Sequence, residues 1–151
     1  ILYITFSTGV GAGLVYKGNL DEAMLDSEAG QMMLANPYKN GEINAWEKFA
    51  SGKALYEKYG KKAEEIDDKT TWEEFTRGMA LGIIELCAVI EPDAIIIGGG
   101  VGTHFNKFGH ILAKEVKKGL PYMVKIPELY GAKNAELASL LGTYEYSRSH
   151  A

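Results

Sequence analysis

The sequence has very little cysteine: Cys87 is the single cysteine among 151 residues. One thiol excludes an internal disulfide framework and any zinc site built from several cysteines, and it suggests a reducing compartment. The neighbours of Cys87 are apolar, so we expect a buried thiol that belongs to the core.

Long apolar runs and an excess of basic residues are also missing. The most apolar stretch, residues 81–97, is interrupted by Glu85, Glu91 and Asp93, which excludes a membrane span. The 16 basic residues are interleaved with 20 acidic ones, so the chain offers no basic stripe for nucleic acid. Residues 1–6 are strand-like and contain neither an initiating Met nor a basic signal region. We therefore expect a cytoplasmic chain that begins within a larger protein.

A glycine-rich turn lies near the start of the chain, at residues 5–13 (Thr-Phe-Ser-Thr-Gly-Val-Gly-Ala-Gly), between two apolar runs. Glycines lack the Cβ atom that keeps a ligand away from the backbone, and they permit positive φ, so successive N–H groups can converge on one phosphate. The candidates for such a site are Thr8, Gly9, Gly11 and Gly13. The alternative is that the glycines only make a tight hairpin turn.

A second glycine-rich turn follows the apolar strand predicted at residues 93–97. It contains Gly98, Gly99 and Gly100 and precedes a predicted helix at residues 103–118. This strand–turn–helix arrangement suits a nucleotide, because the free N–H groups at a helix start attract anions. The spacing is not Gly-x-Gly-x-x-Gly, and neither turn ends in Gly-Lys-Ser/Thr, so the dinucleotide and P-loop motifs both fail.

The remaining elements predict an α/β fold. Strands are expected at residues 1–6, 12–16, 20–25, 31–34 and 122–126. Helices are expected after Asn44 up to an interruption at Gly52, at residues 54–59, and from residue 70 to residue 90. An antiparallel meander is thus followed by alternating helices and strands, which gives a mixed sheet flanked by helices. A last helix is expected after Asn134, with its apolar stripe facing inward: Leu137, Leu140, Leu141 and Tyr144.

Two glycine turns at this separation resemble the phosphate and adenosine motifs of the ROK family of sugar kinases and sugar-responsive repressors. The similarity covers most of the chain and resembles the C-terminal half of such a protein. It implies a ribonuclease H-like lobe of the actin-like ATPase type, spanning residues 1–151, that binds nucleotide and sugar. The N-terminal lobe would be absent from this chain.

The resemblance also implies sugar-binding residues. The family carries a Glu-x-Gly-His motif, and this sequence has Glu28-Ala29-Gly30-Gln31. Residues 46–52 resemble a second family segment, which makes Glu47 a candidate for accepting hydrogen bonds from sugar hydroxyls alongside Glu28 and Gln31. The cysteine cluster that binds zinc in the family has no counterpart here, so no zinc is expected. For Glu47 the alternative is a capping box with Asn44 at the start of a helix.

The resemblance implies an ATP-dependent kinase that transfers the γ-phosphate of MgATP to a hexose-type hydroxyl, with ATP and Mg²⁺ as cofactors. The catalytic Asp of the family lies in its N-terminal half, so no catalytic residue is assigned and the fragment alone is expected to be inactive. The expected partners are the sugar, the N-terminal lobe and a second copy in a homodimer. No membrane is expected as a partner. The alternative is the sugar-sensing part of a repressor, in which case nucleic acid is a partner. A dehydrogenase fragment is a third interpretation.

Overall fold

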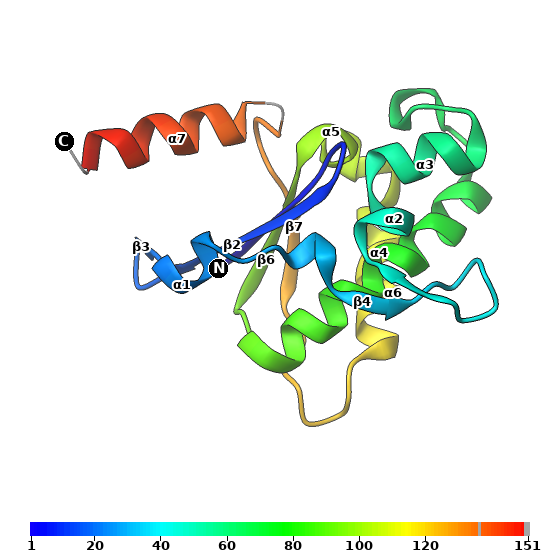
Figure 1. Cartoon of the computed structure of the whole chain (residues 1–151), viewed down its shortest axis with the longest axis horizontal. Coiled ribbons are helices and arrows are strands. Elements are labelled where there is room, and N and C mark those ends of the chain that lie inside the picture. The colour runs from blue at the N-terminus through cyan, green and yellow to red at the C-terminus, as the bar shows by residue number, and fades with distance from the viewer. Residues whose placement is uncertain (136, 150–151) are drawn as a thin grey trace.

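Five strands form the central sheet of the computed structural model: β1 (Leu2–Phe6), β2 (Val10–Tyr16), β3 (Asn19–Leu20), β6 (Ala94–Gly98) and β7 (Glu128–Gly131) (Figure 1). The structure describes residues 1–135 and 137–149. The strand order is β3-β2-β1-β6-β7, with β1 antiparallel to β2 and parallel to β6. This mixed sheet confirms the predicted fold class.

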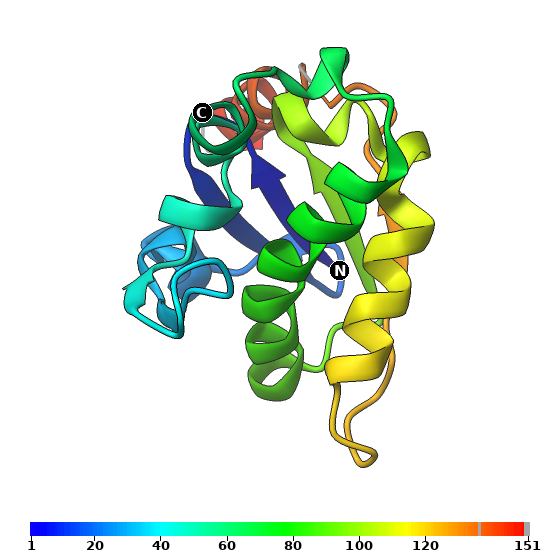
Figure 2. The same cartoon turned by 90° about the vertical axis from the view of Figure 1, so that its right-hand side faces the viewer.

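One face of the sheet is covered by two long helices, α4 (Lys69–Ile90) and α6 (Phe105–Gly119), which lie side by side (Figure 2). Alternate strand residues such as Ile4, Phe6 and Ile97 point toward these helices and are completely buried. Between the helices, the rings of Trp72 and Phe108 stack with centroids 4.7 Å apart. This side of the sheet holds the main hydrophobic core.

Helix α4 begins slightly earlier than the sequence predicts. The carboxylate of Asp68 precedes it and accepts a hydrogen bond from the backbone N–H of Thr71 at 2.8 Å. Hydrogen bonding from the side chain of Thr71, and then from its backbone, lowers the pKa of Asp68. The helix ends at Ile90, and Glu91 caps it in a left-handed conformation with φ of 48° before Pro92. Cys87 on this helix is buried, as predicted, and burial raises the pKa of its thiol to about 11.

The other face of the sheet is approached by α7 (Ala138–Ser149), which extends away from the body of the molecule in Figure 1. The prediction that the apolar residues of this last helix face inward is wrong for the chain as it stands. Leu140 is 67% exposed, Tyr144 is 58% exposed, and Leu137 and Leu141 are about half exposed. The stripe is present, but no surface among the described residues fully covers it.

Shorter elements connect these layers: α1 (Glu22–Leu25), η1 (Ala29–Gln31), β4 (Met33–Ala35), β5 (Ile43–Ala45), α2 (Glu47–Ala50), α3 (Gly52–Tyr59), η2 (Ala63–Glu65) and α5 (Gly99–Gly102). Strands β4 and β5 form a separate antiparallel pair.

Three predicted strands differ from the structure. Residues 21–25 are mostly helical because the carboxylate of Asp21 caps α1 by accepting the N–H of Met24 at 3.1 Å. The strand expected at residues 31–34 begins two residues later, because residues 29–31 form the η1 turn. The strand expected at residues 122–126 is absent there, since Pro121 opens a turn that Val124 closes, and β7 follows instead. Among the described residues, every helix is too short or too polar to cross a membrane.

Candidate functional site

Parallel pairing of β1 with β6 brings the two glycine-rich turns to one edge of the sheet. Thr5, at the end of β1, is the register partner of Gly98, at the end of β6. The β1–β2 turn is closed by a hydrogen bond of 2.9 Å from the N–H of Ser7 to the carbonyl of Gly9. In open α/β sheets, ligands bind beyond the carboxyl ends of parallel strands, which is where both turns lie.

The second turn needs glycine for steric reasons. Gly99 has a φ of +78°, and a Cβ atom there would lie 2.5 Å from the carbonyl oxygen of Phe6. Gly98 packs equally closely, because its Cβ would overlap the hydroxyl of Tyr3. Gly100 faces open space and accepts a hydrogen bond of 2.7 Å from the hydroxyl of Thr103. The first two glycines therefore shape the turn, while Gly100 presents its backbone to solvent.

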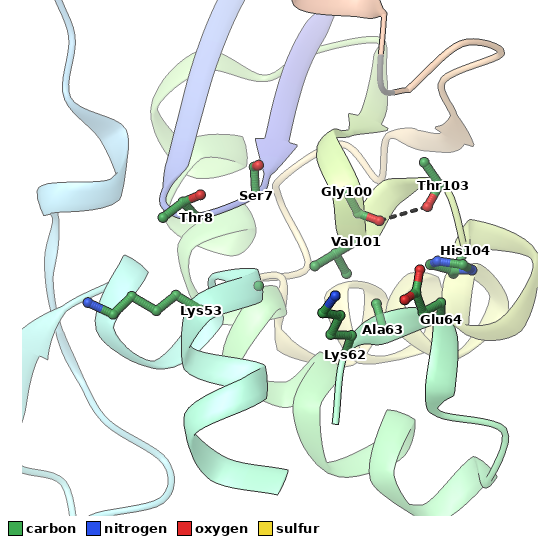
Figure 3. Close-up of a pocket in the computed structure, with 11 residues that line it drawn as sticks. Ser7, Thr8, Lys53, Lys62, Ala63, Glu64, Gly100, Val101, Thr103 and His104 are labelled. Carbon is green, nitrogen blue, oxygen red and sulfur yellow. Dashed lines mark hydrogen bonds between the residues drawn. The ribbon is translucent and has the colours of Figure 1, made fainter. Parts of the chain in front are cut away.

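A cavity of about 280 Å³ lies between the two turns and is shown in Figure 3. The hairpin, the start of α3, the segment around η2 and the α5 turn each contribute to its wall. Lys62 points toward Val101 in this view, and Lys53 extends below Thr8. Its lining consists of Ser7, Thr8, Gly52, Lys53, Lys62, Ala63, Glu64, Gly100, Val101, Thr103 and His104.

The η2 side of the cavity is held in place by Lys107 of α6. Its ammonium donates hydrogen bonds to the carbonyls of Glu64 and Ile66, at 3.2 and 3.0 Å, and to the carboxylate of Asp67 at 2.8 Å. The hydrogen bond and the charge of Lys107 hold the pKa of Asp67 below its usual range. The segment that carries Lys62 and Glu64 is thus tied to the core helices.

A second cavity of about 360 Å³ adjoins the first on the other side of the hairpin tip. The carboxylate of Glu47 lies against this tip, because a Cβ atom on Gly9 would come within 2.7 Å of its Oε2 atom. The same oxygen would lie 3.2 Å from a Cβ on Gly30. The lining consists of Thr8, Gly9, Glu47, Lys48, Ser51, Lys53, Ala54 and Glu57.

The capping-box alternative for Glu47 is wrong. Asn44 lies in β5, and its amide oxygen accepts a hydrogen bond of 2.9 Å from the Asn36 side chain. Helix α2 starts at Glu47 directly after Trp46, and the side chain of Trp46 makes no capping bond. The strand pairing of β5 takes Asn44 out of the position that a cap needs, so the Glu47 carboxylate has no capping role.

Buried contacts of Trp46 fix the position of Glu47. The indole N–H of Trp46 donates to the carbonyl of Gly78 at 3.0 Å, and its ring fills the space that a side chain at Gly82 would occupy. The ring also meets Phe6 edge-on, with centroids 5.5 Å apart. The residue next to Glu47 is therefore anchored in the core, which limits how far the carboxylate can move.

Tyr38 and Asn36 hold the loop between β4 and β5. The Tyr38 hydroxyl donates to the carbonyls of Glu74 and Phe75, at 3.0 and 3.1 Å, and accepts the N–H of Gly78 at 3.2 Å. Burial raises the pKa of Tyr38, so its hydroxyl stays protonated. The side chain of Asn36 accepts the N–H of Tyr38 and is itself buried. Within residues 1–135 and 137–149, no cluster of three or more His, Cys, Asp or Glu side chains suits a metal ion.

Six of the predicted site residues line neither cavity: Gly98 and Gly99, which shape the second turn, and the four described next. Glu28 and Gln31 are exposed at the two ends of η1. Gly11 and Gly13 lie within β2. They line a separate apolar cavity of about 800 Å³ on the face of the sheet that α7 approaches, opposite to α4 and α6. The structure thus brings together Thr8, Gly9, Gly100 and Glu47, with Gly98 and Gly99 shaping the turn behind them.

Sequence reasoning missed the two lysines that line the cavity between the glycine turns, Lys53 and Lys62. A signal existed for Lys53, because it directly follows the Ser51-Gly52 pair that starts a helix, and positive charge beside a glycine turn favours anions. Lys62 lies in a charged stretch whose neighbours are equally polar, so nothing in the sequence distinguishes it.

Comparison with known proteins gives one family. The model of the ROK family matches residues 1–148. The fructokinase of Pediococcus pentosaceus is 31% identical over 121 residues, which cover 75% of this chain and 42% of that protein. The chain spans only 40–43% of the length of the curated relatives that it matches.

Solved structures show the same fold. The ROK hexokinase of Thermus thermophilus superposes with a TM-score of 0.72 at 23% identity, over 98% of this chain and 58% of that one. A ROK glucokinase of Streptomyces griseus, solved with glucose and AMPPNP, has a TM-score of 0.72 at 20% identity, over 98% of this chain and 60% of that one.

Proposed function

The chain belongs to the ROK family, and from this premise we propose that it is the C-terminal lobe of an ATP-dependent sugar kinase. The complete protein would transfer the γ-phosphate of MgATP to a hydroxyl of a hexose-type sugar. One observation carries the proposal: two glycine turns far apart in sequence meet at one cavity, and this cavity adjoins a second one that contains the Glu47 carboxylate.

The cavity between the turns would bind the nucleotide. The hairpin tip at Thr8 and Gly9 and the exposed backbone of Gly100 offer polar groups to phosphates, and Lys53 and Lys62 add positive charge. The described residues offer no dedicated cluster of metal ligands. Mg²⁺ usually keeps several waters and is held mainly by substrate phosphates, so we expect it to enter this cavity with the nucleotide. Bound there, Mg²⁺ would neutralise phosphate charge.

The adjoining cavity would bind the sugar. An ionised carboxylate accepts hydrogen bonds from two hydroxyls at once, and Glu47 is the carboxylate that the core anchors beside the hairpin tip. Glu28 and Gln31 are exposed, and in the sequence they lie on either side of Gly30, the glycine that the Glu47 oxygen approaches. They would contact the sugar from the outer side of the site. Gly11 and Gly13 would act indirectly, by shaping the hairpin.

The remaining parts of the machinery are expected in an N-terminal lobe. We assign no general base to residues of this chain, and we expect the lobe alone to be inactive, because phosphoryl transfer depends on positioning both substrates. A homodimer and a cytoplasmic location accompany the proposal, in keeping with the family resemblance. Zinc is not required by it, since Tyr38 and Asn36 hold the cysteine-free loop.

The test is ADP release by the complete protein with MgATP across a panel of hexoses, amino sugars and N-acetyl sugars. Release that depends on one sugar supports the kinase, and Glu47→Gln should then raise KM for that sugar at least tenfold, because the sugar hydroxyls lose their charged acceptor. Glu42→Gln, in the exposed loop, is the control. Sugar binding without ADP release would instead favour the sensor of a repressor, and DNA binding would be measured next.

A further inference from the structure

We propose that Lys53 contacts the phosphoryl group while it passes from nucleotide to sugar. The proposal rests on the proposed function. Of all the residues that line the two cavities, Thr8 and Lys53 are shared by both linings. If one cavity holds the donor and the other holds the acceptor, the transferred group must cross their common wall. Lys53 provides the cation on that wall.

The backbone of Lys53 is fixed relative to the hairpin tip. The N–H of Gly52 donates a hydrogen bond of 2.6 Å to the carbonyl of Ser7, and a Cβ atom on Gly52 would lie 2.9 Å from that oxygen. The Ser51 hydroxyl caps α3 by accepting the N–H of Ala54 at 3.1 Å. Lys53 is the second residue of this helix, so its main chain is held beside the turn that would bind phosphate.

The side chain of Lys53 is only loosely paired. Its ammonium lies 3.8 Å from the Glu57 carboxylate, and the two side chains are 61% and 62% exposed. A pair this exposed and this long contributes little, so turning toward an incoming phosphate costs little. Lys107 differs, because its ammonium donates to three oxygens of the η2 segment and has a structural role there. In Figure 3 Lys53 extends below Thr8, which lines both cavities.

The chemistry of transfer explains what a cation would do at this wall. The acceptor oxygen bonds to the γ-phosphorus while the bond from phosphorus to the β–γ bridging oxygen breaks. The electron pair of that bond stays on ADP, and the hydroxyl proton passes to the general base expected in the N-terminal lobe. Negative charge lies on the oxygens of the transferring group throughout, so an ammonium on the common wall that meets them in transit stabilises the transition state more than either bound substrate.

The experiment compares methionine variants in the complete protein. Lys53→Met should lower kcat by about 10- to 100-fold, with both KM values changed less than about threefold, because the contact forms mainly in the transition state. Lys53→Arg should restore most of the rate, since it keeps the charge. Lys62→Met should raise KM for ATP with a smaller effect on kcat, because Lys62 lines the cavity between the glycine turns and does not line the second cavity.

Lys69→Met is the matched control. Lys69 also starts a helix, pairs with a glutamate four residues later and is 69% exposed, but it lines neither cavity. Its variant should keep wild-type kinetics. The proposal is overturned if Lys53→Met matches this control, or if it raises KM for ATP and leaves kcat intact. A wild-type protein without sugar-dependent ADP release overturns the proposed function together with this inference, whereas an active wild type with an unaffected Lys53→Met overturns the inference alone.

Discussion

The two faces of the central sheet differ in how completely they are covered. Toward α4 and α6, strand residues such as Ile4 and Phe6 are fully buried, and aromatic rings stack between the helices. Toward α7, the residues of β1 and β2 line an open apolar cavity of about 800 Å³, and Leu140 remains 67% exposed. The covered face presents large apolar side chains, whereas Tyr3, Thr5, Gly11 and Gly13 line the open cavity. The two faces therefore differ both in their strand residues and in the helices that oppose them.

This comparison shows what an apolar stripe can and cannot predict. The stripe of α4 and the stripe of α7 both have helical spacing, yet the first is buried and the second is largely exposed. Periodicity identifies the apolar side of a helix, but burial requires a facing surface of matching extent. The following predictions test this difference by changing matched positions on the two faces.

The largest effect is expected from Trp72→Ala on the covered face. Trp72 is 1% exposed, stacks on Phe108 and donates its indole N–H to the carbonyl of Ile66 at 3.2 Å. Removing it should lower the free energy of unfolding by about 3–5 kcal/mol, since it leaves a large cavity. Urea unfolding followed by circular dichroism measures this. A loss below about 1 kcal/mol would show that the covered face is not tightly packed.

Glycine-to-alanine changes in the two helices should have opposite signs. A Cβ atom at Gly82 of α4 would lie 2.3 Å from the Trp46 ring, so Gly82→Ala should destabilise the chain by about 1–3 kcal/mol through overpacking. A Cβ at Gly142 of α7 meets nothing within 4 Å. Gly142→Ala should therefore stabilise by up to about 1 kcal/mol through helix propensity. Thermal melts of both variants measure the two changes in stability. Equal changes would show that the two faces do not differ in packing.

A smaller effect is expected from Leu140→Ala on α7. The side chain is two-thirds exposed, so the change should alter the free energy of unfolding by no more than about 0.5 kcal/mol. Ile83→Ala on α4 provides the buried comparison, since Ile83 is completely inaccessible and its truncation should cost about 2–5 kcal/mol. Similar losses in the two variants would mean that α7 is packed in solution.

The smallest effect concerns an exposed ion pair on the covered side. Lys107 lowers the pKa of Asp67 in the folded chain, so the pair stabilises the fold above the ordinary aspartate pKa of about 4. This contribution disappears as the pH falls through the lowered pKa. The melting temperature of Asp67→Asn should therefore lie slightly below that of the wild type at neutral pH and converge with it in acid. If the difference in melting temperature between wild type and Asp67→Asn is the same at every pH, the protonation of Asp67 is not linked to stability.

Much of the fold follows from local sequence patterns. The strand–glycine–helix order at residues 94–119 and the long stripe of α4 both appear in the structure. The strands expected at residues 20–25 and 122–126 are wrong because single hydrogen bonds determine the structure there. The cap at Asp21 and the turn after Pro121 outweigh the β propensity of their neighbours. Asn44 failed as a helix cap for the same reason, since it pairs with a strand.

The site was only partly predictable. The glycine turns could be identified from the sequence alone. Gly99 has the positive φ and the close backbone contacts that a glycine in such a turn predicts. The lysines of the cavity wall could not be recognised in this way, because tertiary contacts place them there: the docking of Gly52 on Ser7 positions Lys53, and Lys107 positions the η2 segment that carries Lys62. A charged surface residue and a ligand contact look identical until the chain around them is folded.

The register between β1 and β6 also has a kinetic meaning. Thr5 pairs with Gly98, more than ninety residues further along the chain, so the two turns cannot meet until this long loop has closed. Contacts of such high sequence separation form slowly, because the entropy of loop closure is lost before the pairing compensates for it. During synthesis the hairpin would emerge from the ribosome well before its partner strand. The cavity is therefore a late product of folding, because it is complete only after the segment up to His104 has been synthesised and paired with the hairpin.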